Sequence, residues 1–273
     1  MLIFVGSLGF PKTHNVLLER GTYDRKEGQV ETRLGPEEAV VRHGHGMRAP
    51  TRPGLFGTPH NYPRSSPWSA LTFDDGPDPA WTPRILDALD RAGARATFFV
   101  IAPLAVEHQN IVAAAREAGH EVQFHCTEHA RHTRRSRREV EDDTREGLEM
   151  LRSLGVEPRL WRPPWGVLAP WTQELGDDFG LRLAHWSADT HDWRGDPAPE
   201  MLRRVEPLLG PGSVVLMHDG LGPGARRSGC DETVALVDPL VARLRGMGCE
   251  PATLSGSEPR QTVPGVDTSG VRA

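Results

Sequence analysis

The sequence predicts an α/β protein folded as a distorted (β/α) barrel of about seven strands. From Trp68 onward, strand and helix patterns alternate, which implies a parallel sheet covered by helices. Roughly seven such units over about 190 residues fit a closed or nearly closed barrel better than an open sheet. The reactive side chains also follow directly after the predicted strands, where barrels of this kind carry their active sites.

Strands are expected wherever a short apolar run is bounded by turn residues, a pattern typical of strands buried in a parallel sheet. The predicted strands comprise residues 69–73, 96–101, 121–124, 159–161, 182–187, 213–217 and 251–254.

Helices are expected between these strands, and two of them carry recognisable starts. Thr82 followed by Pro83 predicts an N-cap with proline in the first helical position. Ser136 and Glu139 have the spacing of a capping box, which predicts that a charged helix begins there. Further helices are expected around residues 111–118, 171–178, 199–209 and 233–247.

The composition is that of a globular domain with irregular ends. The chain of 273 residues is long enough for one large α/β domain. Sustained periodicity is missing before about residue 64, so we expect an irregular N-terminal extension over 1–64, the folded domain over 65–256 and a flexible tail over 257–273. A net charge of −5 lacks the basic footprint of nucleic-acid-binding proteins, so no nucleic-acid partner is expected.

The cysteines and the first residues bear on the compartment. Cys126, Cys230 and Cys249 are too few for a disulfide framework in a chain of this size, and we expect free, buried thiols. The apolar stretch 1–10 has no basic residue ahead of it and no small-residue cleavage site after it, so no export signal is expected in the sequence as given. That basis alone favours a cytoplasmic location, and the sequence leaves the location itself open. The stretch is also too short to span a membrane.

Two adjacent carboxylates, Asp74 and Asp75, end the first predicted strand. Placing them side by side is unfavourable unless cations offset them, and a divalent metal for one and an arginine for the other would do so. His125 and His129 follow the third strand, and with one aspartate they make a two-histidine, one-carboxylate set that leaves metal positions open for water and substrate. An exposed acidic turn and two solvated histidines are the alternative, which the convergence of these loops on one rim of a barrel disfavours.

The remaining candidates supply acid–base chemistry. The aspartate that does not bind metal would be free to take a proton from water, and Arg162 would pair with it and fix its orientation. His218 ends an apolar strand on the same rim and is suited to protonate a leaving group, the alternative being a core histidine with a structural role. Trp165 follows two prolines, and its backbone N–H would be a preorganised oxyanion donor, worth roughly 2.7–4 kcal/mol.

These blocks, in this order, resemble the polysaccharide deacetylase family, the NodB-homology domain of carbohydrate esterase family 4. The resemblance covers about residues 68–254. Its motifs match residues 72–76, the pair His125 and His129, and residues 162–166, 189–193 and 216–218.

The resemblance implies a distorted barrel and the removal of N- or O-acetyl groups from sugars such as chitin, peptidoglycan and xylan. A divalent metal is implied, with Zn²⁺ expected and Co²⁺ or Ni²⁺ as alternatives. The implied roles are a general base (Asp74), metal ligands (Asp75, His125, His129), an orienting arginine (Arg162), an oxyanion donor (Trp165), a carboxylate that tunes the catalytic histidine (Asp192), a pocket wall (Trp193), an acetyl-pocket residue (Leu216) and a general acid (His218).

Two positions depart from the family pattern. Cys126 stands where Ser or Thr directly follows the first metal histidine, and Trp165 stands where Tyr is common. A thiol is the weaker hydrogen-bonding group, so the loop between the histidines is expected to be held less firmly. The same metal site acting on a non-sugar amide or an O-acetyl ester, and an inactive carbohydrate-binding module, are the competing hypotheses.

Overall fold

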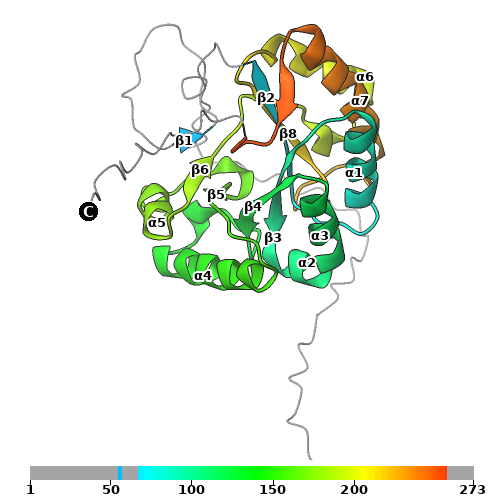
Figure 1. Ribbon diagram of the computed structural model, residues 1–273. Coiled ribbons are helices and arrows are strands. Elements are labelled where there is room, and N and C mark those ends of the chain that lie inside the picture. The colour runs from blue at the N-terminus through cyan, green and yellow to red at the C-terminus, as the bar shows by residue number, and fades with distance from the viewer. Residues whose placement is uncertain (1–54, 57–66, 257–273) are drawn as a thin grey trace, which may run out of the picture. The chain divides into compact units, whose positions relative to one another are not determined.

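A computed structural model describes residues 55–56 and 67–256, and most of the predicted extension over 1–64, as well as the tail over 257–273, lies outside these residues. The strands form one parallel sheet in the order β1-β6-β5-β4-β3-β2-β8-β7, with β9 also paired to β2. The sheet curls on itself and the helices lie around its outside (Figure 1), which confirms the predicted distorted barrel. The strands are β1 (Leu55–Phe56), β2 (Trp68–Asp74), β3 (Thr97–Ile101), β4 (Glu121–Cys126), β5 (Leu160–Trp161), β6 (Arg182–Ala184), β7 (Ala188–Asp189), β8 (Val214–His218) and β9 (Glu250–Ala252).

The predicted strand over residues 182–187 is two strands that belong to different parts of the sheet. β6 pairs with β5 and β1, whereas β7 pairs with β8 at the other end of the strand order. Ser187 marks the change of neighbour, because its backbone N–H already donates to Val214 of β8 at 3.0 Å. An apolar run shows that a segment is buried but not which strand lies beside it, so the division was not predicted.

Seven α-helices are described, and only α2 lies where no helix was predicted. The expected segment 199–209 continues from α6 into a short 3₁₀ turn, Glu206–Leu208. None of the described helices is both long enough and apolar enough to cross a bilayer. The helices are α1 (Thr82–Arg91), α2 (Ala102–Glu107), α3 (Gln109–Glu117), α4 (Arg137–Ser153), α5 (Thr172–Asp178), α6 (Ala198–Val205) and α7 (Asp231–Gly246).

One of the two predicted helix starts is confirmed and the other is wrong in detail. The Ser136 hydroxyl accepts the Glu139 N–H, and the Glu139 carboxylate accepts the Ser136 N–H at 2.7 Å, which is the capping box at the start of α4. Thr82 is instead the first residue of α1. Its hydroxyl accepts the Asp78 N–H at 2.8 Å and donates to the Asp219 carboxylate at 2.7 Å, because a buried acceptor from another loop competes for it.

Alternation along β2 divides the strand between two apolar clusters. Leu71 and Phe73 belong to the large cluster between the sheet and the helices, where Phe73 stacks on the ring of Phe98. Ala70 belongs to a smaller cluster, and the side chains of Thr72 and Asp74 fall on that same inner face by the period of two. The strand therefore delivers Asp74 to the inside of the curved sheet at its carboxyl end.

Candidate functional site

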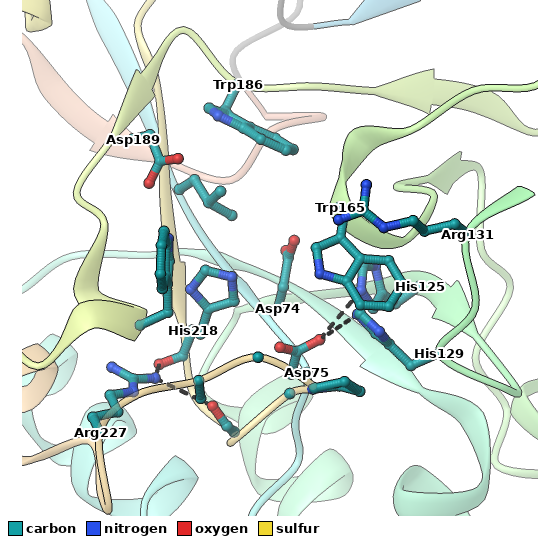
Figure 2. A pocket seen from close by; sticks show the side chains of 17 residues that line it. Asp74, Asp75, His125, His129, Arg131, Trp165, Trp186, Asp189, His218 and Arg227 are labelled. Atoms are coloured by element: carbon teal, nitrogen blue, oxygen red, sulfur yellow. Dashed lines mark hydrogen bonds and ion pairs between the residues drawn. The ribbon is translucent and has the colours of Figure 1, made fainter. Parts of the chain in front are cut away.

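The residues predicted from sequence to form the site meet at one cavity of about 380 Å³ at the carboxyl ends of the strands. Figure 2 shows His218 and Arg227 on one side, His125, His129 and Trp165 on the other, and the two aspartates between them. Arg162 and Asp192 lie behind the wall and bind Asp74 and His218. The predicted residues that line the cavity are Asp74, Asp75, His125, His129, Trp165, Trp193, Leu216 and His218.

Asp75, His125 and His129 form a compact group of three ligand atoms, all within 4.8 Å of one another. The Asp75 Oδ1 lies 3.3 Å from His125 Nε2 and 3.1 Å from His129 Nε2. Burial by itself raises the pKa of Asp75, but the two imidazoles, when they carry protons, lower it by more, and the pKa then lies well below its usual range. The carboxylate is therefore ionised at neutral pH.

The tautomer of His125 suits a metal ligand. Its Nδ1 lies 2.6 Å from the Arg162 carbonyl oxygen, which can only accept, so this nitrogen carries the proton. In the neutral ring, Nε2 then presents a lone pair to Asp75 Oδ1, a buried oxygen with no hydrogen-bond donor among the described residues. Two acceptors at this distance need a cation between them, and a divalent metal fits two imidazoles and one carboxylate.

Arg162 anchors the neighbouring aspartate. This side chain is fully buried, and its Nη1 donates to Asp74 Oδ1 and to Thr72 Oγ1, both at 2.8 Å. Its other nitrogens donate to the carbonyl oxygens of Ala184 and His185. Burial lowers the pKa of Arg162, and Asp74 opposes that effect. Asp74 therefore has one oxygen held in place beside the candidate metal group.

On the opposite side of the cavity, His218 is held by Asp192. The His218 Nδ1–H donates to Asp192 Oδ1 at 2.7 Å, and the His218 backbone N–H donates to Asp192 Oδ2 at 2.9 Å. Burial by itself lowers the pKa of His218, but the buried carboxylate outweighs it and raises the pKa to about 9. His218 is therefore protonated at neutral pH and carries a proton that it could donate.

Arg227 completes this arrangement and was not predicted. Its Nη1 donates to Asp192 Oδ2 at 2.9 Å, and its Nη2 donates to the carbonyl oxygens of His218 and Gly220. Thr233 also donates to Asp192 Oδ2. Burial raises the pKa of Asp192, but His218, Arg227 and Thr233 lower it to about 2. Arg227 lies in a loop outside any strand or motif, so nothing in the sequence pattern distinguishes it.

A glycine-rich loop after β8, residues 220–224, packs against the Asp75 turn. A Cβ on Gly222 would lie 1.9 Å from Asp75 Oδ2, and one on Gly220 would lie 2.5 Å from the Asp75 carbonyl oxygen. Asp75 itself has a φ of 74°, and the following Gly76 N–H donates to the Asp219 carboxylate at 3.1 Å. Glycine is required here because the loop backbone touches a candidate metal ligand.

The loop between the two histidines is held from a direction that was not predicted. Cys126 is buried, and burial raises the pKa of its thiol, so it remains a neutral thiol outside the candidate metal group. The next residue, Thr127, donates its hydroxyl to the Asp143 carbonyl oxygen at 2.8 Å. The Asp143 carboxylate accepts the N–H groups of Thr127 and Glu128. Asp143 on α4 thus anchors the loop in place of a hydroxyl at position 126.

Aromatic side chains wall the cavity. The indole of Trp165 lies edge-to-face with the His129 ring at 4.2 Å between centroids, and its backbone has a φ of 57°. Trp186 and Trp193 line the cavity with Leu216, which is almost fully buried. Such rings offer flat apolar faces beside the polar groups, a combination suited to a small organic ligand.

Comparison with known proteins agrees with this geometry. A family profile described as polysaccharide deacetylase matches residues 61–184. The chitooligosaccharide deacetylase of Bradyrhizobium sp. (strain ANU 289) is 34% identical over 209 residues, which cover 72% of this chain and 94% of that protein. The peptidoglycan-N-acetylglucosamine deacetylase PgdA of Listeria monocytogenes is 32% identical over 68% of this chain, although this chain spans only 37% of its length.

Solved structures agree in the fold as well. The crystal structure of the Bc1960 peptidoglycan N-acetylglucosamine deacetylase superposes with a TM-score of 0.68 at 30% identity, covering 74% of this chain and 91% of that one. The chain therefore belongs to the polysaccharide deacetylase family, carbohydrate esterase family 4.

Proposed function

We propose that this protein is a metal-dependent deacetylase that removes acetyl groups from N-acetylated sugars and releases acetate. The observation that carries the proposal is that one cavity joins the Asp75–His125–His129 group to two oriented pairs, Asp74 with Arg162 and His218 with Asp192. The names of the relatives, a chitooligosaccharide deacetylase and a peptidoglycan-N-acetylglucosamine deacetylase, support an amino-sugar substrate. The proposed catalytic domain covers residues 65–256.

Asp75, His125 and His129 would hold the metal, with Zn²⁺ expected from the ligand set. Such an ion, when bound, polarises a carbonyl group and lowers the pKa of a water molecule.

Asp74 is the proposed general base. Arg162 holds its Oδ1, and the carboxylate lines the cavity beside the metal ligands. Asp74 takes a proton from water as the water oxygen attacks the acetyl carbonyl carbon. The Trp165 backbone N–H is the proposed donor to the resulting oxyanion, and the buried Leu216 is the proposed contact of the acetyl methyl group.

His218 is the proposed general acid. Because Asp192 binds its Nδ1, the proton on Nε2 is the one available to a leaving group. As the carbon–nitrogen bond breaks, His218 protonates the departing amine, and the products are acetate and a free amino sugar. The negative charge of Asp192 stabilises the imidazolium before the proton is transferred, and the same charge raises the pKa of His218.

The test is acetate release from short N-acetylglucosamine oligomers by chelator-stripped protein, with and without added Zn²⁺. Release that returns with the metal is the expected result. A folded protein that binds zinc but releases no acetate from these oligomers would contradict the proposal. Activity on soluble non-sugar amides or O-acetylated xylan instead would assign the same site to another substrate, and metal-independent sugar binding without hydrolysis would identify a binding module.

A further inference from the structure

Arginine guanidinium groups stack on the rings of two tryptophans of the cavity, one on Trp165 and two on Trp193. The Arg131 guanidinium lies 4.7 Å from the centroid of the Trp165 ring. On the other wall, the guanidinium groups of Arg194 and Arg226 lie 5.1 and 5.5 Å from the Trp193 ring. Positive charge therefore lies against both tryptophan walls of a cavity that contains several carboxylates.

These three arginines lack acidic partners among the described residues. No carboxylate of residues 67–256 lies within 4 Å of the guanidinium of Arg131, Arg194 or Arg226, in a chain whose net charge is −5. The two arginines deeper in the site differ, because Arg162 is paired with Asp74 and Arg227 with Asp192. The charge around the two tryptophans is thus left for a partner from outside the described chain.

Arg131 is the best placed of the three. Unlike Arg194 and Arg226, it is half-buried and its side chain lines the cavity. It forms the outer end of a column in which Arg131 lies over Trp165 and Trp165 packs against His129 (Figure 2). Stacking holds the face of a guanidinium and leaves its N–H edge free, and that edge matches a carboxylate with two parallel hydrogen bonds.

We propose that Arg131, held on Trp165, binds a carboxylate on the sugar next to the N-acetylated one, so that the preferred substrate is an acidic glycan. This inference rests on the proposed deacetylase function and narrows its substrate class. Arg194 and Arg226 add positive potential at the opposite wall, which favours approach of an anionic chain. A neutral oligomer of N-acetylglucosamine would leave all three charges without a partner.

The test compares two forms of one oligosaccharide of alternating N-acetylglucosamine and N-acetylmuramic acid, one with free lactyl carboxylates and the other with their methyl esters. With zinc-loaded full-length protein, we expect kcat/KM for acetate release to be roughly 5- to 10-fold higher for the acid, as a partly exposed charge-assisted contact would give. The preference should shrink as salt is added. In Arg131→Gln the ratio of acid to ester should fall close to one.

Arg134→Gln is the matched control, because Arg134 is an exposed arginine of the same loop that does not line the cavity. It removes the same charge and should keep the ratio. Equal rates for acid and ester in the unmodified protein, or the same loss of ratio in Arg134→Gln, would overturn the proposal.

Binding of the two oligosaccharides, measured by titration calorimetry, separates this inference from the proposed function. Tighter binding of the acid that depends on Arg131, without acetate release from any sugar, would refute the deacetylase function and retain the carboxylate site. Acetate release without any preference for the acid would retain the deacetylase function and refute the carboxylate site.

Discussion

Asp192 binds His218 twice, through the Nδ1–H at 2.7 Å and through the backbone N–H at 2.9 Å. The two contacts fix the orientation of the imidazole, because the ring and its own main chain bind one buried carboxylate. The same carboxylate favours the protonated form of the ring. Asp192 Oδ2 also accepts from Arg227 and Thr233, so the carboxylate accepts hydrogen bonds from four donors in all. This relationship leads to the first prediction.

Asp192→Asn should lower activity by roughly 10²–10⁴-fold, the usual contribution of a positioned acid. The charge that raises the pKa of His218 would be gone while burial remains, so the pKa should fall and the protonated form should be lost at lower pH. The measurement is the pH profile of kcat/KM, whose alkaline limb should move to lower pH than in the unmodified protein. Asp178→Asn removes a surface carboxylate paired with Arg137 and should leave the pH profile unchanged. An alkaline limb that does not move in Asp192→Asn would show that Asp192 does not set the pKa of His218.

Asp74→Asn should retain zinc and lose activity by roughly 10²–10⁴-fold, because an amide cannot take the proton from water. The amide oxygen can still accept from Arg162, so the fold around the site should persist. Zinc content and acetate release, measured on the same preparation, check that the metal is retained and that the activity is lost. Full activity with metal bound would refute Asp74 as the base.

Gly222→Ala should weaken zinc binding by roughly 10- to 100-fold, the usual cost of disturbing the surroundings of a metal ligand. Its Cβ would lie 1.9 Å from Asp75 Oδ2, so either the loop or the carboxylate must move. Gly246→Ala is the control, because a Cβ there would meet open space in α7. Competition with a chelating dye gives both dissociation constants, and equal values would show that the loop does not constrain Asp75.

Arg227→Gln should destabilise the protein by roughly 1.5–3 kcal/mol, because it removes one of the two cationic partners of the buried Asp192 carboxylate and leaves only His218 to offset that charge. Urea unfolding monitored by tryptophan fluorescence measures the loss. The double variant with Asp192→Asn should lose less stability than the sum of the two single variants, because Arg227 then no longer offsets a buried negative charge. Strict additivity would mean that Arg227 stabilises the protein through its carbonyl contacts alone.

Acid should destabilise the fold through His120. Its Nδ1 accepts the Ala96 N–H at 3.2 Å, and burial, aided by Arg95, lowers its pKa to about 4. That value lies below the unfolded value of 6.5, so neutral His120 makes its full contribution to the free energy of unfolding above pH 6.5. The contribution, on the order of 2 kcal/mol, is lost as the pH falls towards 4. The measurement is the free energy of unfolding by chemical denaturation at pH 7 and pH 5. The difference between the two pH values should be smaller in His120→Asn than in the unmodified protein, because the asparagine oxygen accepts a hydrogen bond without titrating. An unchanged difference would assign the acid sensitivity to other groups.

Much of the fold and the site follows from local patterns. Strand and helix signals alternate along the chain, and parallel strands end at one edge of the sheet. The residues at those ends must therefore meet, so the sequence alone predicts that Asp74, His125 and His218 lie together, as they do at the cavity. The capping box at Ser136 depends only on neighbours along the chain and was likewise predictable. The assignment of separate roles to Asp74 and Asp75 came from the family resemblance, and these roles stay predictions.

The tertiary structure alone decided the features that depend on contacts distant in sequence. The division of residues 182–187 between β6 and β7 depends on which strands lie alongside, and the hydroxyl of Thr82 turns to Asp219 because a distant loop brings a carboxylate there. Arg227 and Gly222 lie in a loop without periodicity, and their importance comes from the groups that they touch. The sequence by itself determined which residues end the strands, since period and topology act locally, whereas only packing decided what holds those residues, because side-chain partners are chosen in three dimensions.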